Sequence, residues 1–284
     1  MNPADFASAF DEKVDAALEW TAENWSTAFD ALNDALKSLY QAVYWALAVA
    51  PFYVVAALIG ALAWRLTGSW KFAVGTALSL CFCELMGLWP ETMSTLALVL
   101  TATSLALLVG VPAGVAAGLM PALDRVTEPT LDLLQTLPPY IYLLPAIALL
   151  GYGSGTALVA TFIVAVPPVL RLTCLGIRMT PRQFIELGEA SGTTGWQQFF
   201  KIRLLFALPS IMAGVNQSLM MAFGMVVIAG IVGSGGLGEA IYAAIRTLDI
   251  AKSINASIAI VVLTLILDRM TQSLIRGDDA GGRP

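Results

Sequence analysis

Residues 180–209 read TPRQFIELGEASGTTGWQQFFKIRLLFALP, a polar and turn-rich stretch between two long apolar runs. If the flanking runs cross a membrane, this stretch has to lie at the membrane surface. It contains two successive patterns that start helices, so it predicts a helix–turn–helix. A folded element in that position is typical of a docking site for another protein.

The two helix starts have the same form. Thr180 with Gln183, and Thr194 with Gln197, each match a capping box, in which the two side chains hydrogen-bond to each other's backbone amides. Gly192 stands between them and suits the left-handed residue that ends a helix. We therefore expect one short helix up to residue 191 and a second that starts at Thr194.

The composition indicates that lipid surrounds much of the chain. Of its 284 residues, 58% are hydrophobic and only 12% are charged, whereas soluble domains carry about 25% charged residues. A spanning helix needs about 20 apolar residues. By this measure the chain is an all-α membrane protein with about seven transmembrane helices, at residues 41–64, 70–90, 92–120, 131–150, 155–177, 204–232 and 254–275.

The basic residues predict the orientation of these spans, because cytoplasmic loops are enriched in Lys and Arg. With residues 180–203 in the cytoplasm, the only basic residues outside are Lys13, Lys37, Arg246 and Lys252. We therefore expect the N-terminus outside and the C-terminus in the cytoplasm. Arg171 and Asp268 fall near inner ends of spans, where Arg171 can face headgroups and Asp268 can pair with Arg269.

The chain divides into four parts by these criteria. Residues 1–40 have apolar positions three and four apart, which predicts an extracytoplasmic amphipathic segment on the outer leaflet. Residues 41–90 are peripheral transmembrane helices, and residues 276–284 are a cytoplasmic tail. Residues 91–275 form the core, with the polar loop at 179–204. Prolines interrupt three of the core spans, at positions 112, 138, 139, 145, 167 and 168.

The sequence argues against catalysis by this chain. It has no histidine, its cysteines (Cys81, Cys83 and Cys174) lie in apolar runs, and no metal site is expected. Residues 233–238 match G-x-G-x-x-G, but this dinucleotide pattern needs a preceding strand, whereas here it follows an apolar helix-length run. We expect a flexible outer turn there instead. The sequence contains no P-loop, so ATP hydrolysis would belong to a partner.

The polar loop resembles the coupling loop, or EAA motif, of ABC importer permeases. One register places Glu186 first, Gly192 six residues later, and Ile202 and Leu204 at the end of the motif. A second register starts at Glu189-Ala190-Ser191 with Gly195, and the first fits better. Leu187-Gly188 replaces Ala-Ala, and Leu205 replaces the final proline. The resemblance implies ATPase-coupling residues at Glu186, Gly188, Glu189, Ala190, Gly192, Trp196, Ile202 and Leu204.

The likeness extends over most of residues 90–275. The segments LDLLQTLPPYIYLLPAIALLGYGSG (131–155), VPPVLRLTCLGI (166–177), LPSIMAGVNQSLMMAFGMVVIAGIVGSGGLG (208–238) and LILDRMTQ (265–272) resemble permeases of glycine betaine/proline-type ABC importers. The resemblance implies a type I permease core in the bacterial inner membrane. It also implies a second copy of the chain, two cytoplasmic ATPases that bind ATP and Mg, and an extracytoplasmic substrate-binding protein, with no cofactor and no nucleic acid on this chain.

Relatives in that family carry betaines, choline, carnitine, proline or trimethylamine N-oxide. Aromatic faces attract methylated ammonium groups, which makes three tyrosines and three methionines candidates for the translocation pathway: Tyr140, Tyr142, Tyr152, Met220, Met221 and Met225. The same family places the glycine turn near the outer gate and the binding-protein contact, at Gly233, Gly235, Gly236 and Gly238.

Two other functions compete with this interpretation. The first is an ABC permease for an amino acid such as methionine, against which the match at 208–238 argues. The second is an ion-coupled secondary transporter, which should show paired intramembrane acids and internal repeats. Neither feature is evident in the sequence.

Overall fold

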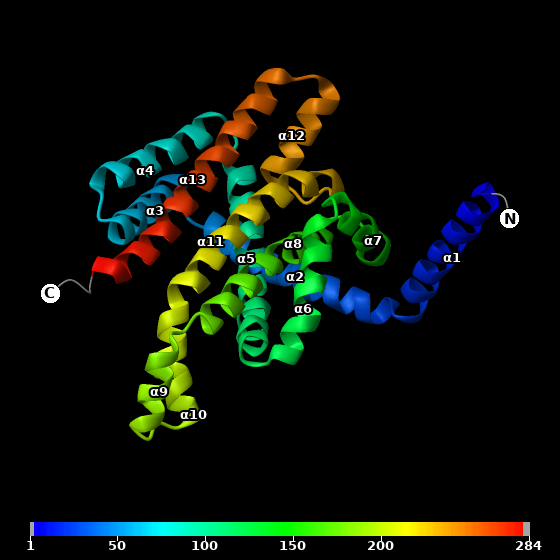
Figure 1. Cartoon of the computed structure of the whole chain (residues 1–284). Coiled ribbons are helices and arrows are strands. Elements are labelled where there is room, and N and C mark those ends of the chain that lie inside the picture. The colour runs from blue at the N-terminus through cyan, green and yellow to red at the C-terminus, as the bar shows by residue number, and fades with distance from the viewer. Residues whose placement is uncertain (1–2, 281–284) are drawn as a thin grey trace.

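The computed structural model describes residues 3–280, and this part of the chain is helical without a strand (Figure 1). The elements in order are α1 (Pro3–Asn24), α2 (Ser26–Ala48), α3 (Phe52–Thr67), α4 (Trp70–Leu85), α5 (Trp89–Leu119), α6 (Pro121–Thr136), α7 (Tyr140–Leu150), α8 (Ser154–Arg178), α9 (Arg182–Ala190), α10 (Gly195–Gln198), the π-helix η1 (Phe199–Arg203), α11 (Leu204–Ala229), the 3₁₀ turn η2 (Gly230–Val232), α12 (Gly236–Thr247) and α13 (Ile250–Ala280).

Four helical runs in the described chain are long and apolar enough to cross a membrane: α5, α8, the continuous run Gly195–Val232 and the Ile250–Leu274 part of α13. The pairs α2–α3 and α6–α7 each bend by 96°, and they raise the number to six if each pair is one span. The remaining predicted span, residues 70–90, corresponds to α4, which has only 16 residues. The all-helical membrane fold is confirmed, but the number of seven spans is not.

Both sharp bends coincide with prolines. Pro51 precedes α3, and Pro138 and Pro139 separate α6 from α7. Proline restricts the preceding residue to extended conformations, and Leu137 accordingly has ψ 135°. The other prolines predicted to interrupt spans (Pro112, Pro145, Pro167 and Pro168) lie inside continuous helices, so that part of the prediction is wrong. Neighbouring helices can satisfy the freed carbonyl groups in such positions.

The centre of the molecule consists of α5, α8 and α11, which approach one another through small residues. A Cβ atom on Gly114 of α5 would lie 2.7 Å from the Thr173 Cβ of α8. On the other side of α8, a Cβ on Gly176 would lie 3.0 Å from the Ala207 carbonyl of α11. Membrane helices associate mainly by such close packing, because lipid offers little hydrophobic driving force. These contacts hold α5, α8 and α11 in one frame.

The N-terminal part is only partly the interfacial segment that we predicted. Helix α1 projects away from the body of the molecule, whereas α2 runs into it (Figure 1). Asn33 of α2 is buried, and its Nδ2 donates a hydrogen bond of 2.8 Å to the Leu150 carbonyl at the end of α7. The Tyr40 hydroxyl of α2 lies 2.7 Å from the Ser94 hydroxyl of α5. The helix therefore passes the predicted boundary at residue 40 and packs on the core.

Helices α3 and α4 form a hairpin that packs beside α13 at the periphery (Figure 1). Gly68, with φ 67°, caps the end of α3 at the tight turn between them. The hairpin lies outside the central helices α5, α8 and α11, and the division of the chain at residue 90 stays a prediction.

Candidate functional site

The first helix of the polar loop starts without the capping box that we predicted. Helix α9 begins after Pro181, and no side chain caps it. Thr180 is buried, and its Oγ1 donates to the Ile177 carbonyl at 3.0 Å, so the hydroxyl serves the end of α8 instead. The Thr180–Gln183 prediction is wrong because the threonine hydroxyl bonds to the last turn of the preceding helix instead.

The turn between the two loop helices has the predicted left-handed glycine. Gly192 has φ 74°, and its amide donates to the Glu189 carbonyl at 3.0 Å. The Thr193 amide donates to the Gly188 carbonyl, also at 3.0 Å, which closes the end of α9. Glycine adopts this conformation without the steric cost that a Cβ atom imposes.

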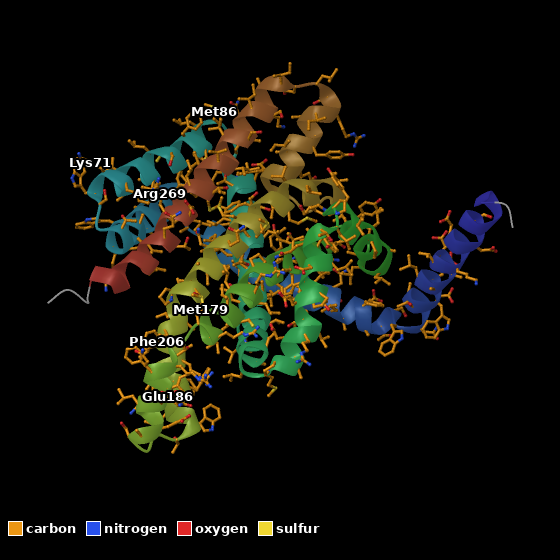
Figure 2. The ribbon with its side chains drawn as sticks, viewed as in Figure 1. Lys71, Met86, Met179, Glu186, Phe206 and Arg269 are labelled. Atoms are coloured by element: carbon orange, nitrogen blue, oxygen red, sulfur yellow. The ribbon has the colours of Figure 1, made fainter. Side chains whose placement is uncertain are left out.

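The second capping box is present. The Thr194 Oγ1 accepts the Gln197 amide at 3.4 Å, and the Gln197 Oε1 accepts the Thr194 amide at 3.0 Å. Helix α10 then continues through η1 into α11 without interruption. The loop is thus a helix–turn–helix whose second limb is the start of a membrane-spanning helix, as Figure 2 shows around Glu186 and Phe206.

Three contacts hold the two limbs of this loop together. Gly188 of α9 faces Ile202 so closely that a Cβ atom on it would lie 2.8 Å from the isoleucine Cδ1. The Gln198 Nε2 donates to the Ile185 carbonyl at 3.2 Å. Phe184 packs on Phe206 with ring centroids 4.8 Å apart. These contacts make the loop a compact body joined to α11.

The loop also carries an apolar surface that nothing in the described chain covers. Trp196 is 75% exposed and stacks on the exposed Phe200 ring at 5.6 Å. Beside Trp196 lies a hollow of about 400 Å³, which is lined by Val115, Leu119, Gly195, Trp196 and Phe199. A contiguous apolar patch of this kind is typical of a protein–protein contact.

The residues predicted for the translocation pathway do not form one site. Tyr142 and Met221 line the same cavity of about 490 Å³, between α6, α7, α8 and α11. Met225 is fully buried in the core, while Tyr140, Tyr152 and Met220 are exposed outside that cavity. Only two of the six candidates therefore meet. The cavity is also lined by Arg171 and by two polar side chains that the sequence did not single out, Gln135 and Gln217.

Two ion pairs connect α6 to α8 near this cavity. Arg171 pairs with Asp132 and also donates to Gln135 at 3.2 Å, and Arg178 pairs with Asp124. We expected Arg171 to face lipid headgroups, and this was wrong because α6 supplies an acid opposite it. The pairing could have been suspected from the four charged residues that the sequence places in residues 121–136.

Asp268 of α13 also has a different partner from the one predicted. Its Oδ1 accepts the Asn216 Nδ2 of α11 at 3.0 Å, and the Gln272 Nε2 donates to the same carboxylate at 2.8 Å. Asn216 in turn accepts the Thr271 hydroxyl at 2.5 Å. Arg269 makes no ion pair with Asp268 in the described chain. The network joins α11 to α13 and satisfies a carboxylate inside a span, which would otherwise be costly.

The glycine turn at residues 233–238 lies at the opposite end of α11 from the loop. Gly233, Gly235 and Gly236 have φ between 70° and 78°. Gly238 packs directly on the Val226 carbonyl of α11, so a Cβ atom cannot fit there. The Leu237 amide donates to the Thr95 hydroxyl of α5 at 2.8 Å. The turn is therefore tightly packed, rather than flexible as we predicted, and a helix rather than a strand precedes it.

Comparison with known proteins agrees with this arrangement. A family model described as "Binding-protein-dependent transport system inner membrane component" matches residues 110–277. The glycine betaine transport system permease protein OpuAB of Bacillus subtilis (strain 168) is 37% identical over 261 residues, which covers 92% of each chain. The glycine betaine/proline betaine transport system permease protein ProW of Escherichia coli (strain K12) is 35% identical, over 96% of this chain and 77% of its own length.

A solved structure shares the fold. The inward-facing MetNI methionine ABC transporter superposes with a TM-score of 0.60 at 22% identity, over 66% of this chain and 94% of that one. At this identity the likeness speaks for the fold alone, whereas the family model covers more than half of the chain and the relatives cover nearly all of it. The chain therefore belongs to the family of inner membrane components of binding-protein-dependent transport systems.

Proposed function

We propose that this chain is the permease subunit of an ATP-driven importer for glycine betaine or similar methylated osmolytes. The observation that carries the proposal is the 37% identity to a glycine betaine permease over 92% of both chains. A carnitine-related permease of Listeria monocytogenes (34% identical) and a trimethylamine N-oxide permease of Pelagibacter ubique (36% identical) point to the same substrate class. The chain is a transport subunit and not an enzyme, as its family indicates.

In this proposal the loop of α9 and α10 is the coupling element. The exposed pair Trp196–Phe200 and the hollow beside it would receive a cytoplasmic ATPase subunit, which binds the ATP and Mg. The proposed coupling residues divide into two groups. One group shapes the loop: Gly188, Gly192, Ile202 and Leu204. The other group is exposed on the two helices of the loop: Glu186, Glu189, Ala190 and Trp196.

The proposed complex contains two copies of this chain, two ATPases and an extracytoplasmic binding protein. The N-terminus would lie outside and the C-terminus in the cytoplasm. Two features support this orientation: the loop and the glycine turn occupy opposite ends of α11, and the basic residues gather on the loop side. The glycine turn then faces the binding protein, and the Tyr142–Met221 cavity lies between the two faces.

Transport in this arrangement depends on different contacts in two states. A ligand can shift a conformational equilibrium only by binding the two states unequally. ATP binding closes the ATPase pair and moves the loop, and α11 follows because it continues from α10.

Uptake by the reconstituted complex tests the proposed function. Proteoliposomes containing this chain, its ATPase and its binding protein should accumulate labelled glycine betaine when ATP is inside, and should not accumulate methionine. Liposomes with an ATPase variant unable to hydrolyse ATP serve as the control. Methionine uptake without betaine uptake would contradict the substrate class, and ion-driven uptake without the ATPase would contradict the transporter class.

A further inference from the structure

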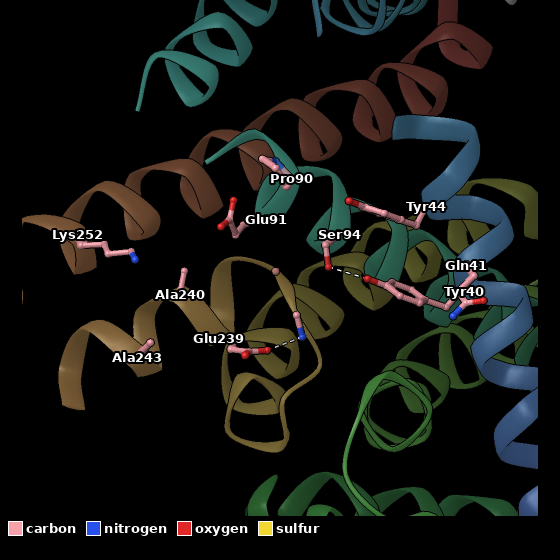
Figure 3. A pocket seen from close by; sticks show the side chains of 12 residues that line it. Tyr40, Gln41, Tyr44, Pro90, Glu91, Ser94, Glu239, Ala240, Ala243 and Lys252 are labelled. Carbon is pink, nitrogen blue, oxygen red and sulfur yellow. Dashed lines mark hydrogen bonds between the residues drawn. The ribbon is translucent and has the colours of Figure 1, made fainter. Parts of the chain in front are cut away.

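A second cavity lies at the glycine-turn end of the molecule, away from the Tyr142–Met221 cavity. It has a volume of about 580 Å³ and lies between α2, α5 and α12, with Lys252 of α13 at its edge (Figure 3). Besides two glycines and two alanines it is lined mainly by aromatic, acidic and hydroxyl groups. Its polar and aromatic lining residues are Tyr40, Gln41, Tyr44, Glu91, Ser94, Glu239 and Lys252.

Two tyrosines of α2 form one wall. The rings of Tyr40 and Tyr44 stack with centroids 6.1 Å apart and an angle of 17°. The Tyr40 hydroxyl bonds to Ser94, which fixes that ring against α5. Both side chains are partly exposed and border the cavity. Such a rigid aromatic wall can attract a cation through the negative ring faces.

Two glutamates border the cavity, and they differ in their partners. The Glu239 Oε2 accepts the Gly235 amide at 2.7 Å, so this carboxylate already supports the glycine turn. The Glu91 Oε2 is buried and has no hydrogen-bond partner in the described chain. Glu91 also has no ion pair with any described Lys or Arg. A buried carboxylate oxygen without a donor or a cation is costly.

The position of Glu91 explains why a negative charge is tolerated there, but it does not provide a partner for the buried Oε2. It lies in the first turn of α5, where the positive end of the helix dipole stabilises a negative charge. The dipole does not replace a hydrogen bond to the buried oxygen. Lys252 lines the same cavity but forms no ion pair with Glu91 in the described chain. A cation bound inside the cavity would supply the missing partner.

The lining argues for an organic cation rather than a metal ion. Hard cations such as Ca²⁺ take six or more oxygen ligands, and no three His, Cys, Asp or Glu side chains come together within residues 3–280. Here one free carboxylate stands beside two tyrosine rings. That combination matches the recognition of methylated ammonium groups by aromatic faces.

We propose that this cavity is a receiving site for a methylated ammonium group, held by Tyr44, Tyr40 and Glu91. The choice of ligand rests on the proposed function. In Figure 3 Glu91 lies between Lys252 and the tyrosines, so Lys252 is placed for the carboxylate of a betaine. The site lies at the end of the molecule where the proposed orientation puts the binding protein.

Direct binding tests the site without the binding protein. The permease–ATPase complex in nanodiscs should bind choline saturably and should not bind 3,3-dimethylbutan-1-ol, its neutral isostere. Glu91→Gln should weaken choline binding about tenfold, since it removes the cavity carboxylate whose buried Oε2 has no partner among the described residues. Glu84→Gln is the matched control, because Glu84 does not line the cavity, and it should bind choline like the natural protein.

The aromatic wall has its own test. Tyr44→Leu should weaken choline binding about three- to tenfold, while Tyr44→Phe keeps the ring and should retain binding. Tyr53→Leu removes an exposed tyrosine outside the cavity and is the control. Lys252→Met should weaken the binding of glycine betaine more than the binding of choline, because choline has no carboxylate for the lysine to pair with.

The outcomes separate this inference from the proposed function. If the natural complex takes up glycine betaine, but choline binding is absent or survives both Glu91→Gln and Tyr44→Leu, the receiving site is wrong and the importer stands. Equal binding of choline and its neutral isostere also overturns the site. If the natural complex fails to take up betaine, the proposed function is wrong regardless of these variants. Assembly with the ATPase shows that each variant is folded.

Discussion

Single glycines carry much of the geometry at both ends of α11, and they do so for different reasons. Gly192 is required for its backbone conformation, because its φ is 74° and nothing lies within 4 Å of an added Cβ. Gly238 is required for space, because its neighbour is the Val226 carbonyl. The two cases predict different responses to substitution.

Gly192→Val should uncouple transport from the ATPase. A β-branched residue at positive φ costs about 1–2 kcal/mol or more, so the turn between α9 and α10 should rearrange. We expect reduced betaine uptake and loss of the ATPase stimulation by loaded binding protein, measured in proteoliposomes. Gly75→Val in the peripheral α4 is the matched control, since Gly75 also has open space but an ordinary φ and lies outside the loop. Unchanged uptake by a well-expressed Gly192→Val variant contradicts the coupling assignment.

Gly238→Ala should destabilise the protein by overpacking. The added methyl group meets a backbone carbonyl that cannot move without shifting α11, and overpacking costs about 1–3 kcal/mol. A lower midpoint of thermal unfolding in detergent is expected. Gly224→Ala, in α11 with nothing within 4 Å of an added Cβ, should leave that midpoint unchanged or raise it. Equal midpoints for both variants would contradict the prediction, because they would show that the glycine turn can shift to accommodate the added methyl group at little cost.

At the scale of elements, the polar contacts between helices join residues that the sequence did not connect. The apolar runs predicted helices well, since their length and composition are local properties. The charges in residues 121–136 suggest a partner for Arg171, but the bend at Pro138 and Pro139 decides which faces of α6 and α8 meet. The partner of Asp268 depends on how α11 packs on α13. Asn33 offered one clue, a polar residue on the apolar stripe between Phe29 and Leu36.

The ion pair between α6 and α8 should show coupling in a double-mutant cycle. Asp132→Arg alone places like charges together, and adding Arg171→Asp should restore the pair. Both side chains are exposed by 60% and 42%, so we expect a coupling energy of only about 0.2–1 kcal/mol at low salt. It should shrink at 1 M salt, where charges are screened within about 3 Å. Thermal unfolding at the two salt concentrations measures it, and strictly additive midpoints contradict the pairing.

The hydrogen bond that joins α2 to the end of α7 is tested by Asn33→Ala. This change removes the hydrogen bond to the Leu150 carbonyl, which should cost about 1–3 kcal/mol because a buried acceptor loses its donor. Asn24→Ala is the control, since Asn24 is exposed and bonds only within its own helix. We expect a lower thermal midpoint for Asn33→Ala alone. If the two variants unfold alike, α2 is held by its apolar contacts.

At the scale of the whole molecule, the fold class and the helix–turn–helix could be predicted, but the number of spans could not. The capping box at Thr194 is a local pattern, and it formed as expected. The count of seven is not confirmed, because hydropathy shows neither that α2–α3 and α6–α7 bend by 96° nor that α4 ends after 16 residues. The predicted pathway residues lie in different places for a similar reason. Tyr142 and Met221 line one cavity because α7 turns away from α6 at the bend, and hydropathy does not show this bend.

The uninterrupted run Gly195–Val232 has a mechanical consequence. Its 38 residues are about 57 Å long at 1.5 Å per residue, nearly twice the thickness of a bilayer core. Gly214 touches the Val169 backbone of α8 at the midpoint, with about 28 Å of helix on the loop side and about 27 Å beyond it. Ala207 and Ser218 also contact α8, so the middle of the run is braced over several turns. A displacement of the loop would therefore be carried along one continuous helix to the glycine turn.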